Sequence, residues 1–169
     1  MRELRFTVPG VPVAQPRQRQ RAVTTKAGGS FIQNYTPTKH PVNVFKAAVI
    51  EHASRAMQAN GWSPFGCPVS VDCTFIMPRP KSDRRASHLI IPSDKKPDID
   101  NLFKALTDAM TGIVYVDDKQ IWIMRADKML SARFGQPECR VCVCFDETDY
   151  SKVKPVLSSQ SQGSEPGTS

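Results

Sequence analysis

Five aspartates lie close together in the sequence, between Asp98 and Asp118, where the only basic residue is Lys104. Asp98 and Asp100 are separated by one residue, and Asp117 and Asp118 are adjacent. Mg²⁺ prefers oxygen ligands and is usually held by one or two carboxylates, with water and substrate phosphate completing its coordination shell. Two such ions can clamp an in-line displacement at a phosphodiester. The spacing therefore predicts a magnesium site for phosphodiester hydrolysis.

Lys104 lies one helical turn after Asp100 and is a candidate partner for phosphate. An ammonium group at this place could hold the scissile phosphate or stabilise the charge that builds on it in the transition state. The alternative is an ordinary ion pair with Asp100 or Asp108, which would contribute only about 0.2–0.5 kcal/mol.

Each aspartate also has a simpler interpretation when it is considered alone. Asp98 follows Pro97, and an aspartate at such a junction can cap a helix by accepting from free amides at its start. Asp117 and Asp118 could form only a turn before a strand. Neither explanation accounts for all five aspartates, so the metal site is the preferred prediction.

Basic residues dominate the rest of the chain, which has 23 Lys and Arg against 16 Asp and Glu and a net charge of +7. Such a balance is typical of proteins that bind polyanions, and metal ions would shield the acidic cluster from a phosphate backbone. The basic runs at 17–21 and 79–96 could be solvated loops, but beside an acidic site we expect them to follow DNA phosphates. The expected DNA contacts are Arg17, Arg19, Arg21, Arg79, Lys81, Arg84, Arg85, Lys95 and Lys96.

Length and composition limit the class of protein. The 169 residues suit one domain, and the 40% of hydrophobic residues are enough for a core. The sequence has no run of about 18 apolar residues and no apolar stretch typical of a secretion signal at its start. We therefore expect a soluble cytoplasmic protein that does not bind membranes.

The cysteines are expected to be reduced. Their number, five, is odd, and no secretion signal precedes them, which argues against a disulfide framework. The set Cys139-x-x-Cys142-x-Cys144 is similar to a metal motif, but no second cysteine pair or nearby histidine completes a tetrahedron. We predict that these thiols belong to the core.

Hydrophobic periodicity predicts the elements that position the aspartates. Alternating apolar residues indicate strands, and apolar residues three and four apart indicate helices. In the second predicted helix, Leu102 and Leu106 lie on an apolar stripe, while Asp100, Lys104 and Asp108 share the opposite face. Strands are predicted at 4–8, 31–35, 69–77, 120–129 and 140–145, and helices at 41–60 and 100–111.

These elements predict one folded domain over residues 1–149. A mobile basic arm or long hairpin, 11–30, interrupts it, and residues 150–169 form a tail rich in Ser, Gln and Gly that is expected to be disordered. The order strand, arm, helix, strand, helix, strand, strand predicts an α+β fold of two layers, in which a mixed β-sheet is backed by two helices.

The motif Pro97-Asp98-Ile99-Asp100-Asn101-x-x-Lys104-x-x-x-Asp108, followed by Asp117-Asp118, resembles the signature of the RusA-like Holliday junction resolvases. Val8-Pro9-Gly10-x-Pro12 and Tyr35-Thr36-Pro37 also resemble segments of phage and prophage members of that family. The resemblance spans roughly residues 3–146.

The resemblance implies a small homodimeric endonuclease of bacterial or phage origin that depends on Mg²⁺, with Mn²⁺ as a substitute. It implies that Asp98, Asp100 and Asp118 bind the metal and that Lys104 is the catalytic lysine. The arm and the tail are longer than a minimal resolvase needs, so the expected substrate is a four-way junction or related branched DNA.

The sequence thus predicts a Mg²⁺-dependent endodeoxyribonuclease that takes part in DNA recombination and repair. The alternative from another class is a non-catalytic nucleic-acid-binding protein whose aspartates only cap and solubilise a helix. A metal-dependent phosphohydrolase of small nucleotides is a third interpretation, and the dispersed positive charge argues against it.

Overall fold

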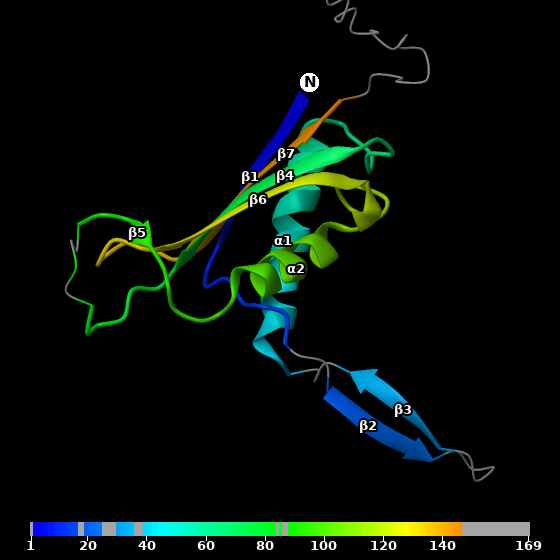
Figure 1. Cartoon of the computed structure of the whole chain (residues 1–169). Helices are drawn as coiled ribbons and strands as arrows, with labels where there is room; N and C mark the ends of the chain where they lie inside the picture. Colours follow the sequence, from blue (N-terminus) through cyan, green and yellow to red (C-terminus); the bar gives the residue numbers. More distant parts are fainter. Residues whose placement is uncertain are drawn as a thin grey trace, which may run out of the picture.

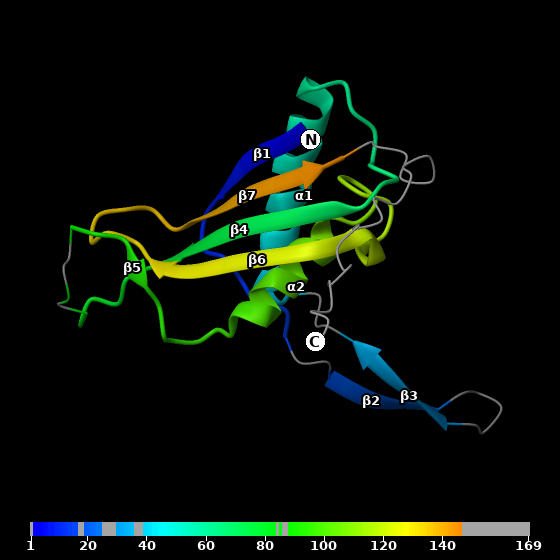
Figure 2. The same cartoon turned by 45° about the horizontal axis from the view of Figure 1, so that its top comes forward.

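The computed structural model is a mixed β-sheet with two helices packed on one face, together with a separate β-hairpin (Figure 1). The structure describes residues 2–16, 39–83, 85 and 88–146 in full, and 19–24 and 30–35 by their backbone alone. Within this described part, no helix covers the other face of the sheet (Figure 2). None of the described helices is long and apolar enough to cross a membrane.

The strands of the sheet lie in the order β1-β7-β4-β6-β5. Strands β4 and β6 are parallel, and the other neighbouring pairs are antiparallel. A parallel pair needs a crossover connection, and the second helix lies in the connection between β4 and β6. The predicted α+β fold, with a mixed sheet and two helices, is confirmed. The strands are β1 (Arg2–Pro9), β4 (Val69–Met77), β5 (Ile91–Pro92), β6 (Ile121–Leu130) and β7 (Glu138–Phe145).

Both predicted helices are present within one residue of their expected ends. Helix α1 (Pro41–Ala59) begins at His40, whose Nδ1 accepts a hydrogen bond from the backbone N–H of Val42 at 3.1 Å. Helix α2 (Ile99–Met110) buries its apolar stripe completely, because Leu102, Leu106 and Met110 have no exposed surface. The polar face of α2 therefore remains for other contacts.

Alternation along the strands decides which side chains reach the core. In β4, Val71 and Phe75 face the helices and are fully buried, whereas Asp72 and Thr74 are only half-buried. Strand β7 follows the same rule. Cys139 is buried as predicted, but Cys142 and Cys144 lie on the uncovered face and are half-buried, so the prediction of core thiols is wrong for these two.

Strand β2 (Arg19–Thr24) of the basic arm pairs with β3 (Ser30–Tyr35), which follows the arm, in an antiparallel register, and the two form a sheet of their own. The base of this arm contacts the body of the protein, because the backbone N–H of Gln15 donates to the carbonyl of Asn101 at 2.8 Å. Residues 17, 18 and 25–29 of the arm and the whole 150–169 tail lie outside the described part of the chain, so the mobility of the arm and the disorder of the tail stay predictions.

Candidate active site

Lys128 on strand β6 makes hydrogen bonds to residues 93–97, the segment that leads into α2. The Lys128 ammonium donates to the backbone carbonyls of Lys95 and Pro97, the latter at 2.8 Å. The backbone N–H of Ser93 donates to the carbonyl of Lys128 at 2.9 Å. The peptide bond between Lys96 and Pro97 is cis. These contacts fix the backbone directly before Asp98, so Lys128 acts as a positioning residue that sequence reasoning did not identify.

Asp98 occupies the N-cap position of α2, with φ −71° and ψ 142°. Its backbone carbonyl accepts from Leu102 N–H at 3.2 Å, but its side chain makes no capping hydrogen bond. Asp100 lies in the first turn, where its carboxylate accepts only a long contact of 3.4 Å from the Asn101 amide. Both aspartates are exposed. Side-chain capping therefore does not account for Asp98, and two neighbouring carboxylates remain available to a cation.

Asp108 connects the two helices through two lysines. Its carboxylate lies 3.1 Å from the Lys46 ammonium on α1 and 3.5 Å from the Lys104 ammonium one turn back on α2. The Lys104 side chain is 60% exposed, whereas that of Lys46 is 23% exposed. The predicted alternative for Lys104, an ion pair with Asp108, is thus present. Lys46 was missed because its contact joins residues far apart in sequence.

Asp117 and Asp118 have different local roles. Asp117 caps the short 3₁₀ helix η1 (Asp118–Gln120), and its carboxylate accepts from Lys119 N–H at 3.0 Å. That hydrogen bond lowers the pKa of Asp117. Gln120 completes a capping box through its contact with Asp117 N–H, and its amide donates to the carbonyls of Phe65 and Cys67. Asp118 is exposed and is not the residue that makes the cap.

Tyr115, three residues before Asp118, contacts helix α2. Its buried hydroxyl donates to the carbonyl of Thr107 at 3.0 Å, in the second half of the helix. Burial raises the pKa of Tyr115, and the negative charges of Asp118 and Asp108 raise it further. The chain thus returns to the second half of α2 at Tyr115, three residues before Asp118, and this places Asp118 toward that end of the helix.

The structure consequently separates the predicted metal ligands. Helix α2 starts on the side of β5 and ends toward the start of β6, and both views agree on this direction (Figures 1 and 2). From Asp100 to Asp108 the helix rises about 12 Å, whereas neighbouring ligand atoms of one Mg²⁺ lie about 3 Å apart. Among the described residues, the group of potential ligands within 4.8 Å of one another is Glu3, Cys142 and Cys144. Asp98 and Asp100 thus share one end of α2, and Asp118 lies toward the other.

One arginine of the basic loop that precedes α2, Arg79, makes hydrogen bonds within the protein. The Arg79 side chain is only 3% exposed, and its guanidinium donates to the backbone carbonyls of Ser131, Arg85 and Leu89. Arg79 therefore organises the loop instead of presenting its charge to solvent, which removes it from the expected DNA contacts. The sequence could not predict this role, because the accepting carbonyls belong to residues 6 to 52 positions away along the chain.

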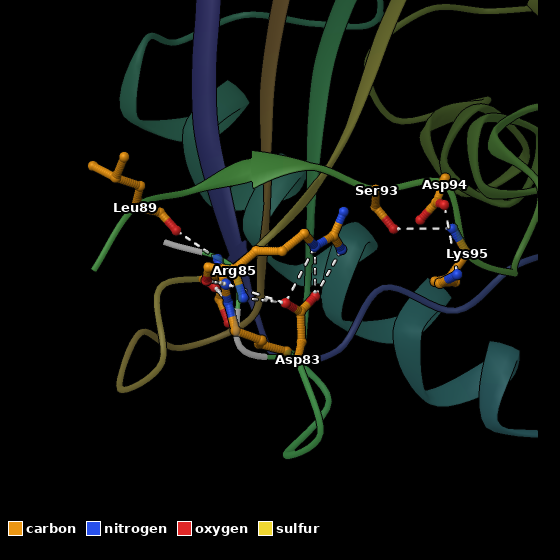
Figure 3. A network of polar contacts seen from close by, with 8 residues as sticks. Asp83, Arg85, Leu89, Ser93, Asp94 and Lys95 are labelled. Atoms are coloured by element: carbon orange, nitrogen blue, oxygen red, sulfur yellow. Dashed lines mark hydrogen bonds and ion pairs between the residues drawn. The ribbon is translucent and has the colours of Figure 1, made fainter. Parts of the chain in front are cut away.

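Arg85 and Lys95 of this loop are exposed, and Figure 3 shows their polar contacts. Arg85 binds Asp83 with both ends of its guanidinium, and these hydrogen bonds lower the pKa of Asp83 to about 2. The Lys95 ammonium lies 3.5 Å from the exposed carboxylate of Asp94. Lys81 and Lys96 are exposed. The side chains of Arg17, Arg19, Arg21 and Arg84 lie outside the described part.

Comparison with known proteins shows a family match and a similar bacterial protein. The family model of the endodeoxyribonuclease RusA matches residues 9–142, a stretch that contains Asp98, Asp100, Lys104 and Asp118. The chain is also similar to the uncharacterized protein YqaN of Bacillus subtilis, with 27% identity over 135 residues, which cover 76% of this chain and 88% of that protein.

Proposed function

Because the chain belongs to the RusA endodeoxyribonuclease family, we propose that it resolves Holliday junctions or related branched DNA by paired, Mg²⁺-dependent hydrolysis of phosphodiester bonds, with Mn²⁺ as a substitute ion. The observation that carries the proposal is the family match over residues 9–142. The uncapped carboxylates at the start of α2 support it, since Mg²⁺ usually takes one or two carboxylates and completes its shell with water and phosphate.

In this proposal, Asp98 and Asp100 hold the cation and Asp118 is the third acidic ligand. Bound Mg²⁺ would polarise the scissile phosphate and make a bound water a better nucleophile. Lys128 keeps the backbone before Asp98 in place, and Gln120 fixes η1 against the loop at Phe65 and Cys67, so both acidic segments are rigidly supported.

Lys104 contacts the scissile phosphate in the same proposal, and Asp108 orients its side chain. Lys104→Arg keeps the charge but replaces a compact ammonium by a broad planar group, so cleavage should slow by at least about tenfold. Lys46→Arg is the matched control, because it changes the other lysine on Asp108 and should cut at nearly the wild-type rate. Single-turnover cleavage measures both. Full activity of Lys104→Arg would reduce Lys104 to a helix ion pair.

The basic surface is proposed to bind the DNA arms. Gln15 joins the base of the β2–β3 arm to the first turn of α2, which places the start of the arm beside Asp100. Within the loop before α2, the exposed basic side chains lie on the segment that leads directly to Asp98. The proposed contacts are Arg17, Arg19, Arg21, Lys81, Arg84, Arg85, Lys95 and Lys96.

We further propose a homodimer in which each metal site combines Asp98 and Asp100 of one subunit with Asp118 of the partner subunit. Asp98 and Asp100 lie at the start of α2 and Asp118 lies in η1 after its end, and this separation motivates the arrangement. Strand β6 begins three residues after Asp118, and it pairs with β5 only at its last two residues, Met129 and Leu130. Its first half thus has an open edge among the described residues, and Trp122 is 67% exposed there. A second copy would cover this edge and its apolar side chains.

The activity is tested with a synthetic four-way junction, a duplex of the same sequence and a single strand. With Mg²⁺ or Mn²⁺, the junction should be cut on two opposing strands, and the duplex and single strand far more slowly. With a chelator, the protein should still bind the junction but should not cut it. Binding without cleavage under all conditions would instead indicate a non-catalytic DNA-binding protein. Hydrolysis of free nucleotides alone would indicate a phosphohydrolase.

A further inference from the structure

A second cluster of potential metal ligands lies on the uncovered face of the sheet, away from the helices. Glu3 on β1 pairs across the strands with Cys144 on β7, and Cys142 follows two residues earlier on the same face. The three ligand atoms all lie within 4.8 Å of one another. Residues from the two ends of the described chain therefore meet at one point, and the two thiols are only half-buried.

The distances suit a tetrahedral ion with soft ligands. The Cys142 and Cys144 sulfurs are 3.8 Å apart, and the Cys142 sulfur is 3.9 Å from Oε2 of Glu3. With Zn²⁺–sulfur bonds of about 2.3 Å and tetrahedral angles, two bound sulfurs lie about 3.8 Å apart, and a sulfur and a carboxylate oxygen about 3.6 Å apart. Little movement is needed to close the three ligands around one ion.

Charge and access also fit a divalent cation. Two thiolates and one carboxylate around a dication leave one negative charge, and Arg5 is next to the cluster to balance it. The Arg5 guanidinium donates to both oxygens of Glu3, at 2.9 and 2.8 Å, and so orients that carboxylate. A wide, open depression of about 720 Å³ adjoins the cluster at Cys142 and is also lined by Arg5. An ion can therefore enter.

A redox role for the two thiols is less well supported. Reactive cysteines have lowered pKa values, because the thiolate is the nucleophile. Here burial, with the hydrogen bond to Cys144, raises the pKa of Cys142 to about 11.

We propose that Glu3, Cys142 and Cys144 form a binding site for a soft divalent cation of the Zn²⁺ class, with solvent at the fourth position. The site is separate from the aspartates on α2, which suit a hard cation. By joining β1 to β7, the bound ion would fasten the edge strand β1 to the sheet. The inference does not depend on nuclease activity, and its test does not use it.

The test is a Co²⁺ titration of the metal-free, reduced, full-length protein in excess Mg²⁺, which occupies hard oxygen sites. We expect a near-ultraviolet sulfur-to-cobalt charge-transfer band that saturates at one Co²⁺ per chain and disappears when Zn²⁺ is added. Zn²⁺ should also raise the midpoint of thermal unfolding by several degrees. Cys142→Ser and Cys144→Ser should each lose most of the band. Glu3→Gln should keep the band at saturating Co²⁺, but its affinity for Co²⁺ should be weaker by about tenfold or more.

Cys67→Ser is the matched control, because Cys67 is also half-buried but lies outside the cluster, and its band should equal that of the wild type. Circular dichroism establishes that each serine variant is folded. The proposal is overturned if the wild type shows no charge-transfer band. It is equally overturned if the Cys142→Ser/Cys144→Ser double variant keeps the band, which would place the ion on other cysteines.

Discussion

Asp100→Asn should abolish junction cleavage while leaving junction binding intact or stronger. The change removes one negative charge from the pair at the start of α2 and replaces a metal-binding oxygen by an amide nitrogen. Losing the metal-dependent stabilisation of the transition state removes several kcal/mol, which corresponds to about 10³-fold in rate. Binding should persist, because less negative charge then faces the phosphates. Single-turnover cleavage with Mg²⁺ and a gel-shift assay with chelator measure the two effects.

The adjacent aspartates Asp117 and Asp118 provide a matched comparison for this experiment. Asp118→Asn should lose activity as strongly as Asp100→Asn if Asp118 is a metal ligand. Asp117→Asn should be nearly fully active, because asparagine can also accept the capping hydrogen bond from Lys119 N–H. Near-wild-type cleavage by Asp100→Asn would refute the assignment of the site. Equal losses at Asp117 and Asp118 would show that the integrity of η1, and not a metal ligand, is being measured.

Local sequence patterns predicted most of the fold, because alternation and helical spacing report which side chains are buried. The buried stripe of α2 and the inward residues of β4 are examples. Strand β5 was missed because it has only two residues, and its pairing with β6 depends on tertiary structure. Helix η1 had a usable signal, since Asp117-x-x-Gln120 is the spacing of a capping box.

Alternation along the last strand could have predicted that Cys142 and Cys144 lie outside the core. Val141, Val143 and Phe145 alternate along the predicted strand at 140–145, which places Cys142 and Cys144 together on the opposite face. Their partner Glu3 could not be identified, because the pairing of β1 with β7 is a matter of strand order. The contact of Lys46 with Asp108 was unpredictable for a similar reason, since it requires the packing of α1 on α2.

The aspartates were expected to lie together, and the structure separates them. Their proximity in sequence suggested one site, but helix α2 (Ile99–Met110) lies between them, with Asp100 in its first turn and Asp118 in η1 after its end. In a homodimer, the two ends of α2 can meet across a two-fold axis, and each site would then draw on both subunits. This arrangement makes a prediction that a site within one chain does not make.

Mixing two inactive variants, Asp100→Asn and Asp118→Asn, should restore nicking. In a mixed dimer with shared sites, one site receives both substitutions, while the other combines intact Asp98 and Asp100 from one subunit with intact Asp118 from the partner subunit. Random assortment gives about half mixed dimers, each with one intact site of two, so about a quarter of the wild-type sites should be active. Each mixed dimer should cut one strand and leave the opposing strand whole.

Co-expression with two different affinity tags isolates the mixed dimers, and strand-specific labels on the junction count the nicks. A dimer of wild type with Asp100→Asn is the control, because it keeps one intact site and makes one nick whether sites are shared or not. Mixed dimers of the two inactive variants that stay as inactive as their parents, beside an active control, would place all three aspartates in one chain. Sedimentation as a monomer at micromolar concentration, free and on a junction, would remove the dimer itself and leave a nuclease that makes unpaired cuts.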